Sequence, residues 1–176
     1  AYRARLIVDG KAQEQGFAIT RDPRVAGVSD ADLKARYDLA QAVTAKVSAA
    51  NDGVILIRNL RAQAEAQAKA KPLPAPVTAL LARLATVEAE LYQVKNQSRQ
   101  DPLNYPIKLN DKLAGLIGVI DSADAAPTEG ARAVFADLSA QLAQQLAALD
   151  AALADLPAAN KALAAAGLKP LVRPGR

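Results

Sequence analysis

The sequence predicts a mainly α-helical protein: an antiparallel four-helix bundle with a long first helix, preceded by an N-terminal β-hairpin. Apolar residues recur at steps of three and four along four separate segments, which is the spacing of one helical face. Alanine and leucine supply most of the apolar content and aromatic residues only 3%, which favours a core of small side chains in close helix contacts. Residues 1–20 instead alternate around an Asp-Gly pair, a pattern typical of a hairpin.

The predicted hairpin occupies residues 1–23. Asp9-Gly10 provides the tight turn, Phe17 to Thr20 is a second β-leaning run, and Asp22-Pro23 closes the segment. Because a two-stranded hairpin alone is marginally stable in water, we interpret it as the remnant of an adjoining β-domain, or as strands laid against the helices. In the first strand, the alternating residues are Tyr2, Ala4, Leu6 and Val8 on one side and Arg3, Arg5 and Ile7 on the other.

The longest predicted helix runs from Ser29 to Lys71, a stretch without proline. Ser29 can cap it, and Asp30 and Asp32 place negative charge in the first turn, where the helix dipole favours it. Gly53 predicts either a kink or a close helix crossing, with equal weight. The glutamine-rich, lysine-rich end of this helix is expected to face solvent.

Prolines at 72, 74 and 76 end the first helix, and a second, antiparallel helix is predicted to about Asn96, with Val94 on its inward face. A polar loop, Lys95 to Pro106, follows, and we expect Leu103 and Tyr105 to hold it together by packing. The third helix is predicted over residues 107–123. Its glycines at 115 and 118 predict that another helix passes closely.

The fourth helix is predicted from Thr128, with an apolar stripe that includes Leu138, Leu142, Leu146 and Leu149. Pro157 breaks or offsets it, and a short last helix over residues 158–166 ends at Gly167. The predicted organisation is therefore a hairpin over 1–23, a helical bundle over 24–168 and an extended tail over 169–176.

The chain has neither cysteine nor histidine, which excludes disulfides, thiolate metal sites and every nucleophile that needs an imidazole base. We expect no catalytic residues, no metal and no cofactor. Asp121 and Asp124 share a helical face and are the candidate pair for a hydrolase, which needs two carboxyl groups about 5 to 9 Å apart in a cleft. A turn-forming role explains this pair more simply.

The net charge is +4, and the lysines and arginines are scattered along the sequence. Arg58, Arg61 and the Lys69/Lys71 pair lack interleaved aromatic residues, so we expect no nucleic-acid partner. No apolar run approaches the roughly 20 residues of a membrane span, so no transmembrane segment is expected. Contact of the fourth helix with a membrane surface stays open as an alternative.

Several phrases of the sequence are recognisable together. They are Arg5 to Lys11, Asp22 to Arg24, Ser29 to Leu33, Tyr105 to Ala114, Asp121 to Thr128 and Val134 to Ser139. These phrases resemble the C-terminal part of large bacterial secreted proteins of the sortilin-like or BNR-repeat β-propeller type, often labelled glycosyl hydrolases. The resemblance implies a secreted or periplasmic setting and a role as an appended C-terminal domain. The propeller's Asp-box pattern, which ends in tryptophan, does not occur, so the propeller's activity does not carry over.

The leading hypothesis is a non-catalytic structural or protein-interaction module, an accessory part of a larger secreted protein, whose partner is another protein or a larger assembly. The candidate partner-binding residues are Tyr2, Arg3, Arg5 and Ile7 in the hairpin, and Leu103 and Tyr105 in the loop. Two alternatives are a carbohydrate-active hydrolase domain and a lipid-surface helical protein. The absence of methionine, even at position 1, indicates a processed product or a piece of a longer protein.

Overall fold

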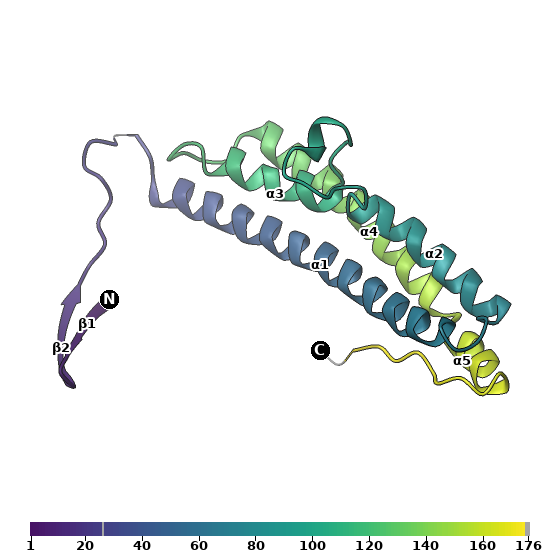
Figure 1. The fold of residues 1–176 in the computed structure, drawn as a ribbon. Coiled ribbons are helices and arrows are strands. Elements are labelled where there is room, and N and C mark those ends of the chain that lie inside the picture. The colour runs from purple at the N-terminus through teal and green to yellow at the C-terminus, as the bar shows by residue number, and fades with distance from the viewer. Residues whose placement is uncertain (26, 175–176) are drawn as a thin grey trace.

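The computed structural model describes residues 1–25 and 27–174, and it confirms the predicted fold class: a helical bundle with an N-terminal antiparallel hairpin (Figure 1). A short 3₁₀ turn, Asp101–Leu103, lies in the loop between the second and third helices. The strands are β1 (Tyr2–Val8) and β2 (Lys11–Phe17), and the helices are α1 (Asp30–Ala68), α2 (Ala75–Leu91), α3 (Leu109–Ile120), α4 (Glu129–Leu153) and α5 (Leu156–Ala165).

Ser29 caps helix α1, as predicted, and the cap is a complete capping box. Ser29 Oγ accepts from the backbone N–H of Asp32 at 3.1 Å, and Asp32 Oδ2 accepts in return from the backbone N–H of Ser29 at 2.9 Å. Its 39 residues give a length of about 58 Å. Of the two alternatives predicted for Gly53, the structure shows close contact with neighbouring helices. A Cβ at this position would lie 3.3 Å from Leu91 Cδ1 and 3.4 Å from Leu149 Cδ2.

Helices α2, α3 and α4 pack along α1, and α5 packs against α2 near the C-terminal end of α1 (Figure 1). The N-terminal half of α1 packs against α3 and the start of α4, and its C-terminal half packs against α2 and the end of α4. The smaller core cluster lies at the N-terminal half: Leu39, Val43, Leu116, Ile120 and Ala131. The larger cluster includes Ile57, Leu60, Leu80, Leu84, Leu142 and Leu163.

Two predictions about helix faces are wrong. Helix α2 ends at Leu91, earlier than predicted, and Val94 lies beyond it with its side chain exposed. Gly115 and Gly118 do not mark a close crossing, because a Cβ at either position would meet nothing within 4 Å. Both glycines fall outside the buried stripe of α3, which consists of Leu109, Asn110, Leu113, Leu116 and Ile120.

The C-terminal end of the chain returns toward the middle of the bundle. Helix α5 packs against α2 and ends at Gly167, whose left-handed φ of +71° turns the chain. Residues 168–174 form neither helix nor strand and run back along α1 (Figure 1). Leu171 is buried among the core residues, so this tail is docked on the bundle.

Among residues 1–25 and 27–174, no helix combines the length and the apolar character that spanning a membrane requires.

Candidate partner-binding site

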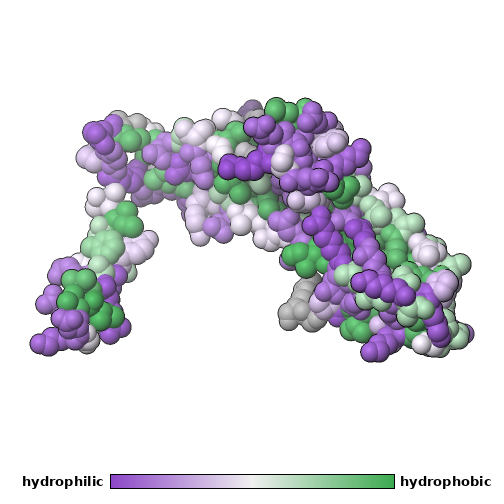
Figure 2. Space-filling model, viewed as in Figure 1, coloured by the Kyte–Doolittle hydropathy of each residue, from purple (hydrophilic) through white to green (hydrophobic). Residues whose placement is uncertain are grey.

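The hairpin stands away from the helices, beyond the N-terminal end of α1 (Figure 1). Every residue of β1 and β2 is exposed. In the space-filling view, apolar side chains gather on the hairpin within a polar rim (Figure 2). The large apolar residues of the two strands are each about half exposed or more: Tyr2, Leu6, Ile7, Val8 and Phe17.

The sequence dictates how the hairpin closes. Asp9 and Gly10 both have positive φ, at 49° and 75°, which is the conformation of a two-residue type I′ turn. The turn sets the register, in which Val8 pairs with Lys11 and Tyr2 pairs with Phe17. The rings of this last pair stack with their centroids 5.7 Å apart, which fastens the open end of the hairpin.

The two faces of the hairpin differ in chemistry because side chains alternate along each strand. One face, which we call the apolar face, carries the large side chains of Tyr2, Leu6, Val8 and Phe17. The register also places Ala4, Lys11, Gln13 and Gln15 on this face, so its polar side chains are those of β2. The opposite face is charged, because Glu14 lies between the two arginines of β1. Its carboxylate is 3.7 Å from Arg3 and 3.5 Å from Arg5.

The hairpin also has free edges. In antiparallel pairs, hydrogen-bonded and non-hydrogen-bonded residues alternate, and the pair beside a two-residue turn is hydrogen-bonded. The register therefore makes Arg3, Arg5 and Ile7 the residues of β1 whose backbone N–H and C=O groups point away from β2. In the described part of the chain the sheet has these two strands alone, so β1 offers an open edge.

The linker after the hairpin is shaped by ion pairs. Arg24 donates hydrogen bonds to the Asp22 carboxyl from its side chain, the shortest at 2.6 Å, and from its backbone N–H. These bonds hold the pKa of the Asp22 carboxyl below its ordinary value. Arg21 lies 3.2 Å from Asp30 in the first turn of α1 and also donates to the backbone oxygen of Val28. These contacts join the linker to the capped start of α1.

Of the two loop residues expected to pack, Leu103 does not, whereas Tyr105 does. Leu103 is 85% exposed and so does not hold the loop together by packing. The loop is organised by polar contacts: Asp101 accepts from the backbone N–H of Ser98 at 2.8 Å, and Gln93 Nε2 donates to the backbone oxygen of Pro106 at 2.7 Å. Tyr105 is half-buried beneath the ammonium group of Lys95, 5.4 Å from the ring centroid.

The predicted site residues therefore fall into two separate places. Tyr2, Arg3, Arg5 and Ile7 lie together in β1, whereas Leu103 and Tyr105 lie in the loop between α2 and α3 (Figure 1). The hairpin offers a face and an edge, while the loop offers single exposed side chains. The hairpin is the stronger candidate surface.

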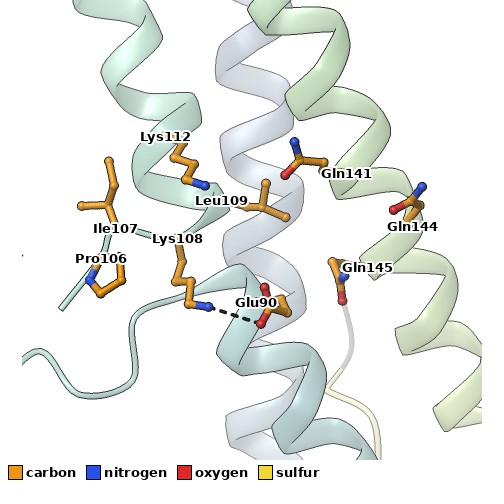
Figure 3. Close-up of a pocket in the computed structure, with 9 residues that line it drawn as sticks. All are labelled: Glu90, Pro106, Ile107, Lys108, Leu109, Lys112, Gln141, Gln144 and Gln145. Atoms are coloured by element: carbon orange, nitrogen blue, oxygen red, sulfur yellow. Dashed lines mark hydrogen bonds and ion pairs between the residues drawn. The ribbon is translucent and has the colours of Figure 1, made fainter.

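A polar recess lies beside the loop, where α2, α3 and α4 meet (Figure 3). Its volume of about 250 Å³ is below the 300 to 1,000 Å³ that is usual for ligand pockets. Lys108 reaches across to Glu90 at 3.2 Å, and the facing helix α4 contributes Gln141, Gln144 and Gln145 (Figure 3). The recess provides amide groups, the ion pair of Lys108 with Glu90 and a second lysine, Lys112, but among its lining residues no nucleophile is paired with a base.

The carboxylates considered for a hydrolase lie in an open turn. Asp121 and Asp124 are both exposed, and Arg36 donates to Asp124 at 2.7 Å. Asp124 also borders a shallow hollow of about 280 Å³ beside the linker, which Asp22 lines as well. Asp22 is paired with Arg24, and Asp124 is paired with Arg36. The pKa of Asp22 is lowered, whereas a general acid requires a raised pKa.

A third surface feature is an open apolar groove between α3 and α4. Val119 and Val134 face it from the two helices and are about half exposed. The leucine stripe of α4 does not contribute a free face, because Leu138, Leu142 and Leu149 are buried in the bundle. Nothing in the structure shows what covers the groove.

The sequence reasoning missed an ion triad around a buried carboxylate. Glu88 of α2 accepts from Arg58 Nε at 2.7 Å and from Arg61 Nη2, both on α1, and its side chain is only 2% exposed. The signal was present, since Glu88 falls in the apolar stripe between Leu84 and Leu91 and the two arginines are three residues apart. The arginines that we considered as phosphate ligands are thus partners of a buried carboxylate.

In the described residues, no cluster of acidic side chains is suited to hold a metal ion. Comparison of the chain with protein-family models, curated proteins and solved structures gives no match. The resemblance to propeller-type secreted proteins therefore stays a prediction from the sequence phrases.

Proposed function

We propose that this chain is a non-catalytic structural and protein-interaction module, in which the helical bundle holds out the hairpin for a partner. The observation that carries the proposal is the exposure of every residue of both strands, including the apolar face of Tyr2, Leu6, Val8 and Phe17. An isolated two-stranded sheet is marginal in water. Burial of this face against a partner supplies the stabilisation that the hairpin lacks.

The partner in this proposal is a β-sheet of another protein or of a larger assembly. The free edge of β1 presents backbone groups at Arg3, Arg5 and Ile7, which is the arrangement that an added strand uses. Backbone hydrogen bonds along this edge supply affinity, and the apolar face supplies specificity through the side chains that it buries. The resemblance of the sequence supports a secreted or periplasmic protein of propeller type as the larger assembly.

Photo-crosslinking in the source cells tests the proposal. A photoreactive amino acid replaces Leu6 on the apolar face in one variant and Ala136 on the exposed side of α4 in the other. We expect position 6, and not position 136, to give one reproducible crosslinked protein whose attachment site maps to a β-strand. Equal crosslinking from both positions, or none from position 6, would contradict the proposal.

A matched pair of proline variants then tests the edge. Arg5→Pro removes an outward-pointing N–H from β1, and Glu14→Pro removes one from β2. Both variants lose the Arg5–Glu14 ion pair, so they differ mainly in which edge is blocked. We expect Arg5→Pro to lower the crosslinking yield at least about tenfold and Glu14→Pro to retain most of it. Equal yields would show that the edge of β1 is not used.

A further inference from the structure

The C-terminal tail, residues 168–173, is bound to the bundle in the manner of an extended peptide. It forms no helix or strand, and most of its side chains are exposed. Leu171 is the exception: it is 2% exposed and belongs to the main core cluster, with Leu168 half-buried against the same cluster. The tail therefore uses one full anchor and one partial anchor.

Side-chain amides hold the backbone of the tail. Asn160 of α5 donates through Nδ2 to the backbone oxygen of Leu171 at 3.0 Å and accepts through Oδ1 from its N–H at 2.8 Å. Gln63 of α1 makes the same paired contact with Val172, both bonds at 2.8 Å. Gln67 Oε1 accepts from the N–H of Lys169 at 2.6 Å.

The surface of α1 and α5 that the tail covers, called the groove below, therefore binds backbone through side-chain amides and takes one leucine into the core. Peptide-recognition sites combine the same elements: backbone hydrogen bonds give affinity and a side-chain pocket gives specificity. Pro170 precedes the anchor and restricts the tail to extended conformations, which lowers the entropy lost on binding.

The tail is held to the bundle by few contacts. It joins α5 through Gly167, whose left-handed conformation glycine adopts without strain. Apart from the turn bond from Leu168 N–H to Leu163 at 2.9 Å, the backbone bonds that hold it come from side chains of other elements. Burial of a single leucine and these few bonds must offset the ordering of the whole segment.

We propose that the groove between α1 and α5 is a peptide-binding site, filled in this chain by its own tail, and that the tail of a second copy of the chain fills it in exchange. The tail of a second copy has the same sequence, so an exchanged tail reproduces every contact of the one seen here. Exchange of an identical segment between copies is a low-cost route to association. The attached tail has the advantage of high local concentration, so exchange requires that its own docking be weakened.

A complementary pair of full-length variants tests this. The acceptor carries Leu171→Ser, which removes the anchor of its tail and leaves its groove intact. The donor carries Gln63→Glu and Asn160→Asp, which replace two N–H donors by carboxylate oxygens facing carbonyl groups, and leave its tail intact. The acceptor's own tail keeps its backbone bonds but lacks the leucine anchor, and the donor's own groove lacks the two N–H donors. Only a donor tail in an acceptor groove combines the anchor with all the bonds.

We expect each variant alone to sediment as a monomer and the equimolar mixture to form a one-to-one heterodimer at about 0.1 to 1 mM protein. A synthetic peptide of residues 167–174 should dissociate this heterodimer, and the same peptide with serine at the position of Leu171 should not. The proposal is overturned if the mixture sediments as two monomers while both variants keep the helical circular dichroism of the wild type.

Native-state hydrogen exchange of the wild-type chain keeps the test decisive if a variant fails to fold. The amides of Leu171 and Val172 should exchange by local opening, at least about tenfold faster than the buried amides of α1 and with little dependence on denaturant. Exchange of these two amides only through global unfolding would show that the tail is a fixed part of the bundle, and would refute exchange between copies.

Discussion

Glu88 Oε1 accepts a hydrogen bond from Arg58 Nε at 2.7 Å, across the contact between α2 and α1. Arg61, one turn further along α1, donates to the other carboxylate oxygen. Arg58 also lies over the ring of Tyr92, 4.6 Å from its centroid. The triad fixes how α2 is placed along α1, because a shift of either helix would leave a buried carboxylate without its partners.

The first prediction concerns the loss of this carboxylate. Glu88→Gln should lower the free energy of unfolding by about 2 to 3 kcal/mol, less than for a fully enclosed pair because both arginines keep contact with water. Urea denaturation monitored by circular dichroism measures the change. Glu90→Gln is the matched control, since Glu90 pairs with Lys108 at the surface, and it should cost less than about 1 kcal/mol. Equal effects would mean that the triad does not bear on stability.

The second prediction is the pH dependence of the same triad. Burial raises the pKa of Glu88, but hydrogen bonds from Arg58 and Arg61 and their charges outweigh it, so the pKa lies below the ordinary value of 4.5. The stability that the triad supplies is therefore complete above about pH 4.5 and is lost as the pH falls through the pKa of the folded state.

Wild type and Glu88→Gln, compared by urea denaturation at about pH 6 and about pH 3, should differ clearly at the higher pH and much less at the lower. Asp22, Asp32 and Asp101 also have lowered pKa values, but they contribute equally to both proteins and cancel in the difference. A stability difference that does not change with pH would count against the assigned pKa direction.

The third prediction is that substitutions at Gly53 and Gly118, both in helices, have opposite effects on stability. Gly53→Val should destabilise the protein by about 2 kcal/mol, because Leu91 and Leu149 already lie at contact distance from a Cβ at that position. Gly118→Ala should stabilise it by about 0.5 to 1 kcal/mol, since that face of α3 is open and alanine is the better helix former. Thermal unfolding of both variants measures this. A stabilising Gly53→Val, or a destabilising Gly118→Ala, would contradict the placement of these faces.

The fourth prediction concerns the turn after α5. Gly167→Ala should cost about 1 kcal/mol or more, because its φ of +71° is strained for a residue with a Cβ and the Cβ would approach Lys71 Nζ. Gly130→Ala, in the first turn of α4, is the control: its Cβ would meet only Thr128 Oγ1 at 3.9 Å, so no loss is expected. Chemical denaturation should rank the two variants in this order. The reverse order would argue against the left-handed turn.

Local patterns accounted for most of the architecture. The Asp9-Gly10 turn and the spacing of leucines at three and four depend on neighbours along the chain, so they can be recognised without tertiary information. The face of a helical glycine depends on the whole stripe: Gly118 lies off the stripe that Leu113 and Leu116 define, and weighing its spacing against theirs would have corrected the prediction.

The tail contacts had no local signal. Gln63 and Val172 are 109 positions apart, and nothing in a glutamine on an exposed-looking helix end indicates that it holds a distant backbone. Of the candidate site, the hairpin residues could be placed in advance by alternation, whereas Leu103 could not, because the packing of a long loop depends on contacts such as those of Asp101.

The order of the amide contacts along the tail has a mechanical consequence. Bonds to Val172, Leu171 and Lys169 succeed one another, so a tension applied to the tail from its far end loads them one at a time and not together. A pulling experiment should therefore release this segment at low force, as a small gain in contour length, before the long helix yields.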